Sequence, residues 1–188
     1  MEKLIFIIDN SYSVLEYKKS YLECVNKVIE GQRNLNENAF LSVYTFNDWV
    51  RQICKDVPIK TFGKINFECL NMTALYDSLV HILKKEDLSS DILKNIIVLT
   101  DGDDTSSVNS GVEKVKKYVL NNSNKNCRFI FLGITSKSLE TAKLMGFKIN
   151  ILYDTSKDTF LNIPTVVSEL FKRKDIDELD FIMSNLKI

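Results

Sequence analysis

An uninterrupted run of apolar residues at positions 4–8 limits what this chain can fold into more than any other feature. The run, Leu-Ile-Phe-Ile-Ile, is apolar at every position, whereas a strand with one face in water alternates apolar and polar residues. Strands of this kind are covered by helices on both faces, as in parallel sheets. The run ends abruptly in Asp9, Ser11 and Ser13. The sequence therefore predicts an α/β fold with polar side chains at the carboxyl end of a buried strand.

Segments with strand-like and helix-like patterns alternate along the rest of the chain. Apolar runs predict further strands at residues 39–46, 50–57, 95–100, 127–134 and 147–152. Apolar residues at helical spacing predict helices at 14–30 (ending at Gly31), 74–85, 108–119, 139–145 and from about Pro164. Asn47 and Asp48 predict a tight hairpin, which makes the strand at 50–57 antiparallel. This order predicts a doubly wound, mostly parallel, Rossmann-like six-stranded sheet with one antiparallel edge strand and helices on both faces.

The length and the charge of the chain restrict its organisation and its partners. Its 188 residues suit one domain with a short tail, which we expect at residues 1–171 and 172–188. Apolar residues at helical spacing predict that the tail is a short amphipathic helix, lying on the domain or on a partner. Lysine plus arginine balance aspartate plus glutamate at 25 each. We therefore expect neither nucleic acid nor a membrane as a partner, because no overall field attracts them.

The cysteines and the N-terminal residues indicate a compartment. Four cysteines are scattered without a C-x-x-C pair, which argues against a zinc site or a redox motif. The N-terminus lacks the basic, apolar and small-residue pattern of a signal peptide. No apolar run approaches the ~20 residues needed to cross a bilayer. We expect a cytoplasmic protein with reduced cysteines.

Five oxygen-bearing residues form a candidate metal site. Asp9, Ser11 and Ser13 occupy alternate positions, which share one face in an extended segment. Thr73 and Asp101 lie in two later loops, and Asp101 directly follows the strand predicted at 95–100. The carboxyl ends of parallel strands meet at one edge of a sheet, where ligands bind. Hydroxyls and carboxylates are the hard ligands that Mg²⁺ or Mn²⁺ prefers, so we expect these three loops to converge on one such ion.

The composition of this site suggests binding rather than catalysis. With mainly neutral hydroxyls in contact, the ion stays electrophilic and has a position for an anionic ligand, most simply a carboxylate of another protein. The carboxylates of Asp9 and Asp101 would hold metal-bound water. No residue is placed as a general base, so we do not expect an enzyme.

The same residues resemble a known family. Asp9-x-Ser11-x-Ser13, Thr73 before Ala-Leu-Tyr-Asp-Ser-Leu, and Asp101 in Leu-Thr-Asp-Gly-Asp-Asp resemble the metal-ion-dependent adhesion site of von Willebrand factor A domains. The resemblance covers residues 1–171. It implies a Rossmann-like sheet, a Mg²⁺ surrounded by these five residues, and a role in binding a protein ligand. Intracellular complex assembly and extracellular adhesion are both known uses of such domains, and the lack of a signal peptide favours the former.

One position departs from the family pattern. The residue between the two serines is often glycine in von Willebrand factor A domains, but here it is Tyr12. Its larger side chain would cover the site or contact the partner.

Several alternatives remain open on the sequence alone. Thr73 is also a suitable N-cap for the helix at 74–85, and Asp101-Gly102-Asp103 is also a turn. An acid at the end of the first strand, together with a metal ion, is also found in phosphotransferases of the haloacid dehalogenase type. Those enzymes need a second acid at the position that Ser11 occupies here. A hydrolase would need the only histidine, His81, and no G-x-S-x-G motif accompanies it. A scaffold with a vestigial metal site, binding through its tail, is the third alternative.

Three further acids lie near the site in the sequence. Asp77 lies one helical turn beyond Thr73 and either braces that loop or points into solvent. We expect Asp103 and Asp104 to be solvated loop acids; the alternative is that they orient the metal ligands through hydrogen bonds.

Overall fold

A six-stranded sheet forms the centre of the molecule. The computed structural model describes residues 2–123, 126–152 and 167. Its strands are β1 (Glu2–Asp9), β2 (Phe40–Phe46), β3 (Val50–Pro58), β4 (Leu93–Thr100), β5 (Cys127–Gly133) and β6 (Ile149–Leu152). Its helices are α1 (Lys18–Leu35), α2 (Leu75–Lys85), α3 (Val112–Asn122) and α4 (Ser136–Leu144), with short 3₁₀ helices η1 (Tyr12–Tyr17) and η2 (Ile59–Thr61). The predicted α/β class and six strands are confirmed.

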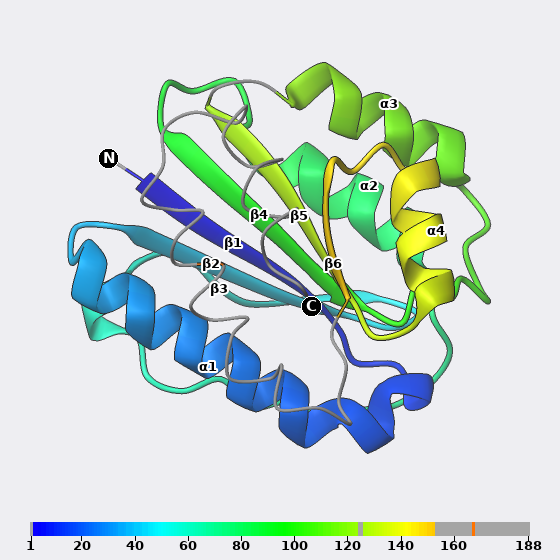
Figure 1. Ribbon diagram of the computed structural model, residues 1–188, viewed down its shortest axis with the longest axis horizontal. Helices are drawn as coiled ribbons and strands as arrows, with labels where there is room; N and C mark the ends of the chain where they lie inside the picture. Colours follow the sequence, from blue (N-terminus) through cyan, green and yellow to red (C-terminus); the bar gives the residue numbers. More distant parts are fainter. Residues whose placement is uncertain (1, 124–125, 153–166, 168–188) are drawn as a thin grey trace.

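The strand order creates a switch point beside β1. The sheet has the order β3-β2-β1-β4-β5-β6, with β3 antiparallel to β2 and the other neighbours parallel (Figure 1). The chain leaves β1 toward β2 on one side, and later enters β4 on the other side. Connections therefore diverge at the carboxyl ends of β1 and β4, which is where open α/β sheets bind ligands.

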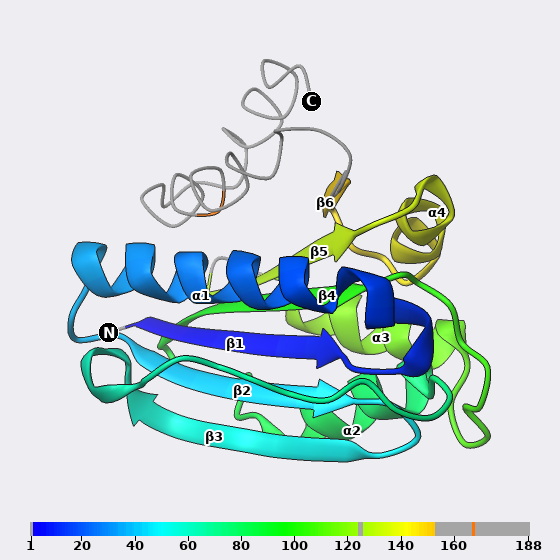
Figure 2. The same ribbon diagram turned by 90° about the horizontal axis from the view of Figure 1, so that it is seen from below.

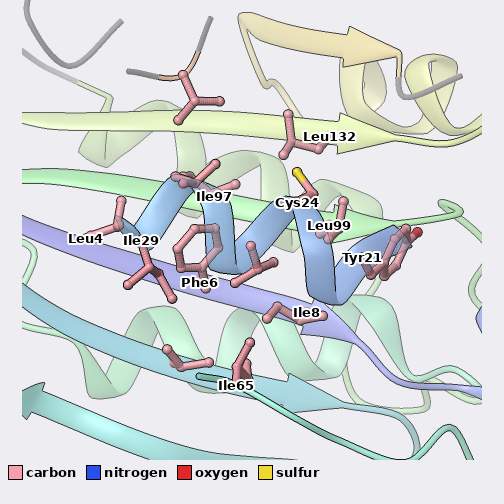
Figure 3. Close-up of a cluster of buried hydrophobic side chains, with 14 of the residues drawn as sticks. Leu4, Phe6, Ile8, Tyr21, Cys24, Ile29, Ile65, Ile97, Leu99 and Leu132 are labelled. Atoms are coloured by element: carbon pink, nitrogen blue, oxygen red, sulfur yellow. The ribbon is translucent and has the colours of Figure 1, made fainter. Parts of the chain in front are cut away.

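Helices cover both faces of this sheet, as the apolar run at 4–8 predicts. Leu4, Phe6 and Ile8 of β1 pack against α1, in the cluster drawn in Figure 3. Ile5 and Ile7 point to the opposite face and pack with residues of α2 and α3. Figure 2 shows α1 on one side of the strands and α2 on the other. All five of these side chains are buried, so the helices exclude water from both sides of β1.

The first helix is longer than predicted, and its start is different. The chain forms the 3₁₀ helix η1 before α1, and α1 continues past Gly31 to Leu35. Gly31 therefore does not terminate the helix. The continuation is anchored by tertiary bonds: Gln32 donates to Glu2 Oε2 at 3.0 Å, and Arg33 donates to the carbonyls of Ile59 and Phe62. These partners lie far away in the sequence, so local helix-stop signals did not predict them.

The third helix starts four residues later than predicted. It begins at Val112, and Val108 is 86% exposed in the preceding loop. The backbone N–H groups of Val108 and Asn109 donate to the carboxylate of Asp77, which holds this segment outside the helix. The fourth helix ends before Gly146 as predicted, with Gly146 at φ +81°.

Two of the expectations concern residues outside the described ranges. The tail at 172–188 lies there, and so does the helix expected from Pro164, except for Val167, which is buried and helical. In the parts of the chain that the structure describes, no helix has the length and apolar character needed to span a membrane.

Candidate metal site

Asp9, the last residue of β1, is the buried centre of the candidate site. Its side chain is completely inaccessible to solvent. Oδ1 accepts a hydrogen bond from the Ser11 N–H at 2.8 Å, and Oδ2 accepts one from the Thr100 hydroxyl at 2.7 Å. Burial, with a smaller contribution from the nearby charge of Asp101, raises the pKa of Asp9 to about 7 against the opposing effect of these hydrogen bonds. A cation beside Asp9 would offset both costs.

Ser11 and Ser13 present two hydroxyls at the same place. Their Oγ atoms are 3.0 Å apart; Ser11 is buried and Ser13 is exposed. The two hydroxyls lie together as the sequence predicts, but only part of the segment is extended. Ser11 is the extended N-cap of η1 (φ −69°, ψ 168°) and Ser13 lies inside this 3₁₀ helix, so the start of η1 brings the two serines together. The pair lies at the protein surface with one hydroxyl facing solvent.

Thr73 lies in the second loop and is tied to the third. Its side chain is buried; its carbonyl accepts from the N–H groups of Thr105 and Ser106 at 2.8 and 3.0 Å. Its own N–H donates to the Thr105 hydroxyl at 2.9 Å. The N-cap of α2 is Ala74, without a side-chain cap. The alternative that Thr73 serves as the helix cap is therefore wrong.

Backbone hydrogen bonds also join the first loop to the second. Tyr12 N donates to the Asn71 carbonyl at 3.0 Å, and Leu70 N donates to the Asn10 carbonyl at 2.9 Å. Figure 2 shows η1 at the end of the molecule to which the arrowheads of β1 and β2 point. Together with the Thr73–Thr105 bonds, these contacts bring the three predicted loops side by side at the carboxyl ends of the strands.

Asp101 directly follows β4, the parallel neighbour of β1. It is nearly buried, and its Oδ1 accepts from Asp103 N at 3.0 Å. Gly102 follows at φ +83°, where a Cβ would lie 2.6 Å from Ser138 Cα. Only glycine fits this turn without displacing α4. The backbone of Asp101 is therefore set by the packing of a helix that begins 35 residues further along the chain.

Several residues that support the site have roles that the sequence did not predict. Thr100 orients Asp9 through its hydroxyl. The only sequence signal for this role is that Thr100 directly precedes Asp101. Asp104 is not simply solvated: Oδ1 accepts from Tyr76 N at 3.3 Å and from the Ser107 hydroxyl at 2.6 Å. Asp77 braces the third loop through the N–H groups of Val108 and Asn109, whereas the sequence suggested that it braces the loop of Thr73. Lys137 of α4 forms an ion pair with Asp103 at 2.7 Å.

The donor set and its geometry fit a small, hard cation. Cis ligands of an octahedral Mg²⁺, with bonds of 2.0–2.1 Å, lie about 2.9 Å apart. The 3.0 Å separation of the two serine hydroxyls matches this edge. Among the described residues, no group of three or more His, Cys, Asp or Glu side chains could hold a metal. An ion at this place would therefore depend on hydroxyl ligands, with the carboxylates in support.

Comparisons with known proteins identify the fold. No protein-family model matches the sequence, and no curated protein does. Among solved structures, the ArnB paralog VWA2 from Sulfolobus acidocaldarius has a TM-score of 0.64 and 19% identity, over 89% of this chain and 44% of that one. A von Willebrand factor type A structure from Catenulispora acidiphila has a TM-score of 0.63 and 18% identity, over 92% and 42% of the two chains.

A third similar structure is the open conformation of the pilus adhesin SpaC from Lactobacillus rhamnosus GG. It has a TM-score of 0.72 and 12% identity, over 91% of this chain and 30% of that one. The chain thus spans less than half the length of each of these three proteins. At such identities the likeness concerns the fold. The six-stranded sheet, its single antiparallel edge and its covering helices are those of the von Willebrand factor A fold.

Proposed function

We propose that this protein is a metal-dependent protein-binding module. Mg²⁺, or Mn²⁺ in its place, is held directly by the hydroxyls of Ser11, Ser13 and Thr73, and through water by the carboxylates of Asp9 and Asp101. An acidic group of a protein partner takes the remaining position. The observation that most supports this proposal is the 3.0 Å pair of serine hydroxyls above the buried Asp9 carboxylate.

The hydrogen bonds of Asp9 favour the water-mediated role. Each of its oxygens already accepts one hydrogen bond, from Ser11 N and from the Thr100 hydroxyl. A carboxylate has about four acceptor sites, so acceptor capacity remains for ordered water. The bound cation would supply an electrophilic centre whose charge is only partly neutralised by its neutral ligands. Ser13 is exposed, which leaves an approach from solvent for a partner carboxylate.

Two further arguments support a binding role over an enzymatic one. The position two residues after Asp9, where a phosphotransferase of the haloacid dehalogenase type has its second acid, is Ser11. The similar structures include a pilus adhesin. We propose intracellular complex assembly as the context of this binding.

Direct metal titration tests the site. Isothermal titration with Mg²⁺, and electron paramagnetic resonance with Mn²⁺, should detect one ion per chain in the wild type. Ser13→Ala removes an exposed hydroxyl ligand and should weaken binding at least tenfold while leaving thermal stability in EDTA unchanged. Ser89→Ala removes an exposed hydroxyl that donates to Asp87, outside the site, and serves as the matched control. Equal metal binding by wild type and Ser13→Ala would contradict the proposed ligand set.

Ligand capture tests the partner chemistry. The wild-type protein, immobilised in Mg²⁺, should retain a protein partner from its native cell, and EDTA should release it. The captured partner should no longer bind once the Asp or Glu with which it contacts the metal is changed to Asn or Gln. Release by EDTA without any dependence on an acidic residue would contradict the carboxylate part of the proposal.

An assay with a generic phosphate ester tests the enzymatic alternative. We expect no turnover of para-nitrophenyl phosphate in Mg²⁺ above that of Asp9→Ala. Turnover that is lost in Asp9→Ala would instead identify a phosphotransferase or phosphatase.

A further inference from the structure

Exposed apolar side chains gather next to the candidate metal site. Tyr12 is 67% exposed, Trp49 64%, Leu70 55% and Met72 53%. Backbone hydrogen bonds join Tyr12 to Asn71 and Leu70 to Asn10. They place Leu70 and Met72, which follows Asn71, beside the loop that contains Tyr12 and the two serines. Large apolar side chains exposed together, next to polar groups, are typical of interaction surfaces.

A pocket of about 430 Å³ lies on one side of this apolar group. It is formed between the β2–β3 turn and the 66–70 segment, and Trp49, Arg51, Leu70 and Asn10 are among its lining residues. Its volume is in the range of small-molecule and side-chain pockets, about 300–1,000 Å³. Asn10 lies between Asp9 and Ser11, so the pocket begins where the candidate metal site ends. We call it the Trp49 pocket.

The walls of the Trp49 pocket are held in place by hydrogen bonds. Trp49 N donates to Asn47 Oδ1 at 3.2 Å, and Trp49 O accepts from Asn47 N at 3.2 Å, which close the β2–β3 turn. On the other side, Asn10 Nδ2 donates to the Glu68 carbonyl at 2.8 Å. These bonds fix the backbone from which the Trp49 side chain projects, and tryptophan is frequent at binding hot spots.

The charged groups of the Trp49 pocket favour an anionic ligand. Arg51, paired with Thr45 in the register of β2 and β3, is exposed and forms no ion pair with any described residue. The one acid that lines the pocket, Glu68, is paired with Lys18 at 2.8 Å. Arg51 therefore brings to the pocket a guanidinium that no described ion pair neutralises, and Trp49 and Leu70 line the same pocket. A planar guanidinium is suited to bind a carboxylate through two parallel hydrogen bonds.

We propose that the Trp49 pocket binds an apolar, preferably aromatic, side chain together with an adjacent carboxylate of the protein ligand. The ring packs against Trp49 and Leu70, and the carboxylate accepts hydrogen bonds from Arg51. The partner segment is thus an acidic peptide with an aromatic residue, whose second acid reaches the metal. The pocket part of this proposal is independent of metal, and only the bridging part rests on the function proposed above.

The pocket is tested first without metal, with N-acetylphenylalanine as the probe. Trp49 is the only tryptophan of the chain, so its indole Nε1–H resonance in NMR spectra reports on this pocket alone. In EDTA, N-acetylphenylalanine should shift this resonance saturably. N-acetylphenylalanine amide, which lacks the carboxylate, and N-acetylglycine, which lacks the ring, should each bind at least about tenfold more weakly than N-acetylphenylalanine. No shift with N-acetylphenylalanine would overturn the pocket proposal.

Three variants separate the two contacts. Arg51→Gln should abolish the preference for N-acetylphenylalanine over its amide, because only the acid interacts with the guanidinium. Leu70→Ala should weaken both probes to the same extent. Lys60→Gln loses the same charge at an exposed position outside the pocket and should bind like the wild type. Retention of the acid preference in Arg51→Gln, or its loss in Lys60→Gln, would overturn the role of Arg51.

The bridge to the metal is tested with N-acetyl-Glu-(Gly)n-Phe peptides that have one to four glycines and a free carboxylate. In Mg²⁺, the peptide of best length should bind at least about tenfold more tightly than the same peptide with Gln for Glu, since the second contact is intramolecular. The difference should vanish in EDTA and in Ser13→Ala. Equal binding of the Glu and Gln peptides, with the Trp49 shift intact, would overturn the bridge alone. Metal-dependent binding without a Trp49 shift would overturn the pocket alone.

Discussion

The hydroxyl of Thr100 at the end of β4 donates a 2.7 Å hydrogen bond to Oδ2 of Asp9 at the end of β1. The same hydroxyl accepts from Gly102 N at 3.1 Å, so Thr100 connects the buried carboxylate to the third loop of the site. Because Ser11 N bonds the other oxygen, the Asp9 carboxylate is fixed at both ends before any ligand binds. Pre-organisation of this kind lowers the cost of ordering a binding site.

The raised pKa of Asp9 predicts how the stability of the metal-free protein depends on pH. The folded state binds the Asp9 proton more tightly than the unfolded state, because its pKa rises from 3.8 to about 7. The contribution of Asp9 to the free energy of unfolding is therefore largest below pH 4 and is lost as the pH rises to 7, by up to roughly 4 kcal/mol. Urea unfolding in EDTA of wild type and Asp9→Asn, at several pH values, measures this loss as the difference between them. A difference that does not change with pH would contradict the burial of an ionisable Asp9.

Metal affinity should have the opposite pH dependence. A divalent cation favours the ionised form of Asp9, so binding must displace the proton below pH 7. We expect the Mg²⁺ affinity to fall up to about tenfold for each pH unit below 7 and to be constant above pH 8. Isothermal titration between pH 5.5 and 8.5 measures it. In Asp9→Asn, any remaining affinity should be nearly independent of pH over this range.

Gly102→Ala should damage both the fold and the site. Alanine at φ +83° is strained, and its Cβ would lie 2.6 Å from the Ser138 backbone. We expect a loss of more than about 2 kcal/mol in the free energy of unfolding, and weaker Mg²⁺ binding because the neighbouring Asp101 is displaced. Gly111→Ala is the matched control, since a Cβ there meets nothing within 4 Å and its φ is −111°. Equal stability of the two variants would show that α4 can move away from the turn.

Lys137 should reduce metal affinity through its charge. Its ammonium group bonds Asp103 at 2.7 Å, and this hydrogen bond raises the pKa of Lys137, with a smaller effect of Asp101. A positive charge near Asp101 repels a divalent cation, so Lys137→Gln should bind Mg²⁺ about threefold more tightly at low ionic strength. The gain should shrink in 0.5 M salt. Lys143→Gln, in the same helix and also exposed, should bind like the wild type. An unchanged affinity in Lys137→Gln would place its charge outside the field of the site.

Local sequence patterns were sufficient for the strands, and much less so for the helix ends. Residues 4–8 are apolar at every position because both faces of β1 are covered, and this requirement is visible in the sequence itself. The extension of α1 to Leu35 and the late start of α3 depend on bonds to Glu2, Ile59 and Asp77. These partners are distant in sequence, so periodicity contains no signal for them.

The candidate site divides in the same way. The sequence by itself determined which oxygen-bearing residues follow the buried strands, because a polar residue at the end of a buried strand interrupts the apolar pattern. Only the tertiary structure decided that the start of a 3₁₀ helix, rather than a fully extended segment, pairs Ser11 with Ser13, and that Thr100 supports Asp9. It also decided that Trp49 and Arg51 line a pocket with Leu70 next to that site. Contacts of this kind join separate loops, and their geometry follows from how the strands and helices pack rather than from any one segment.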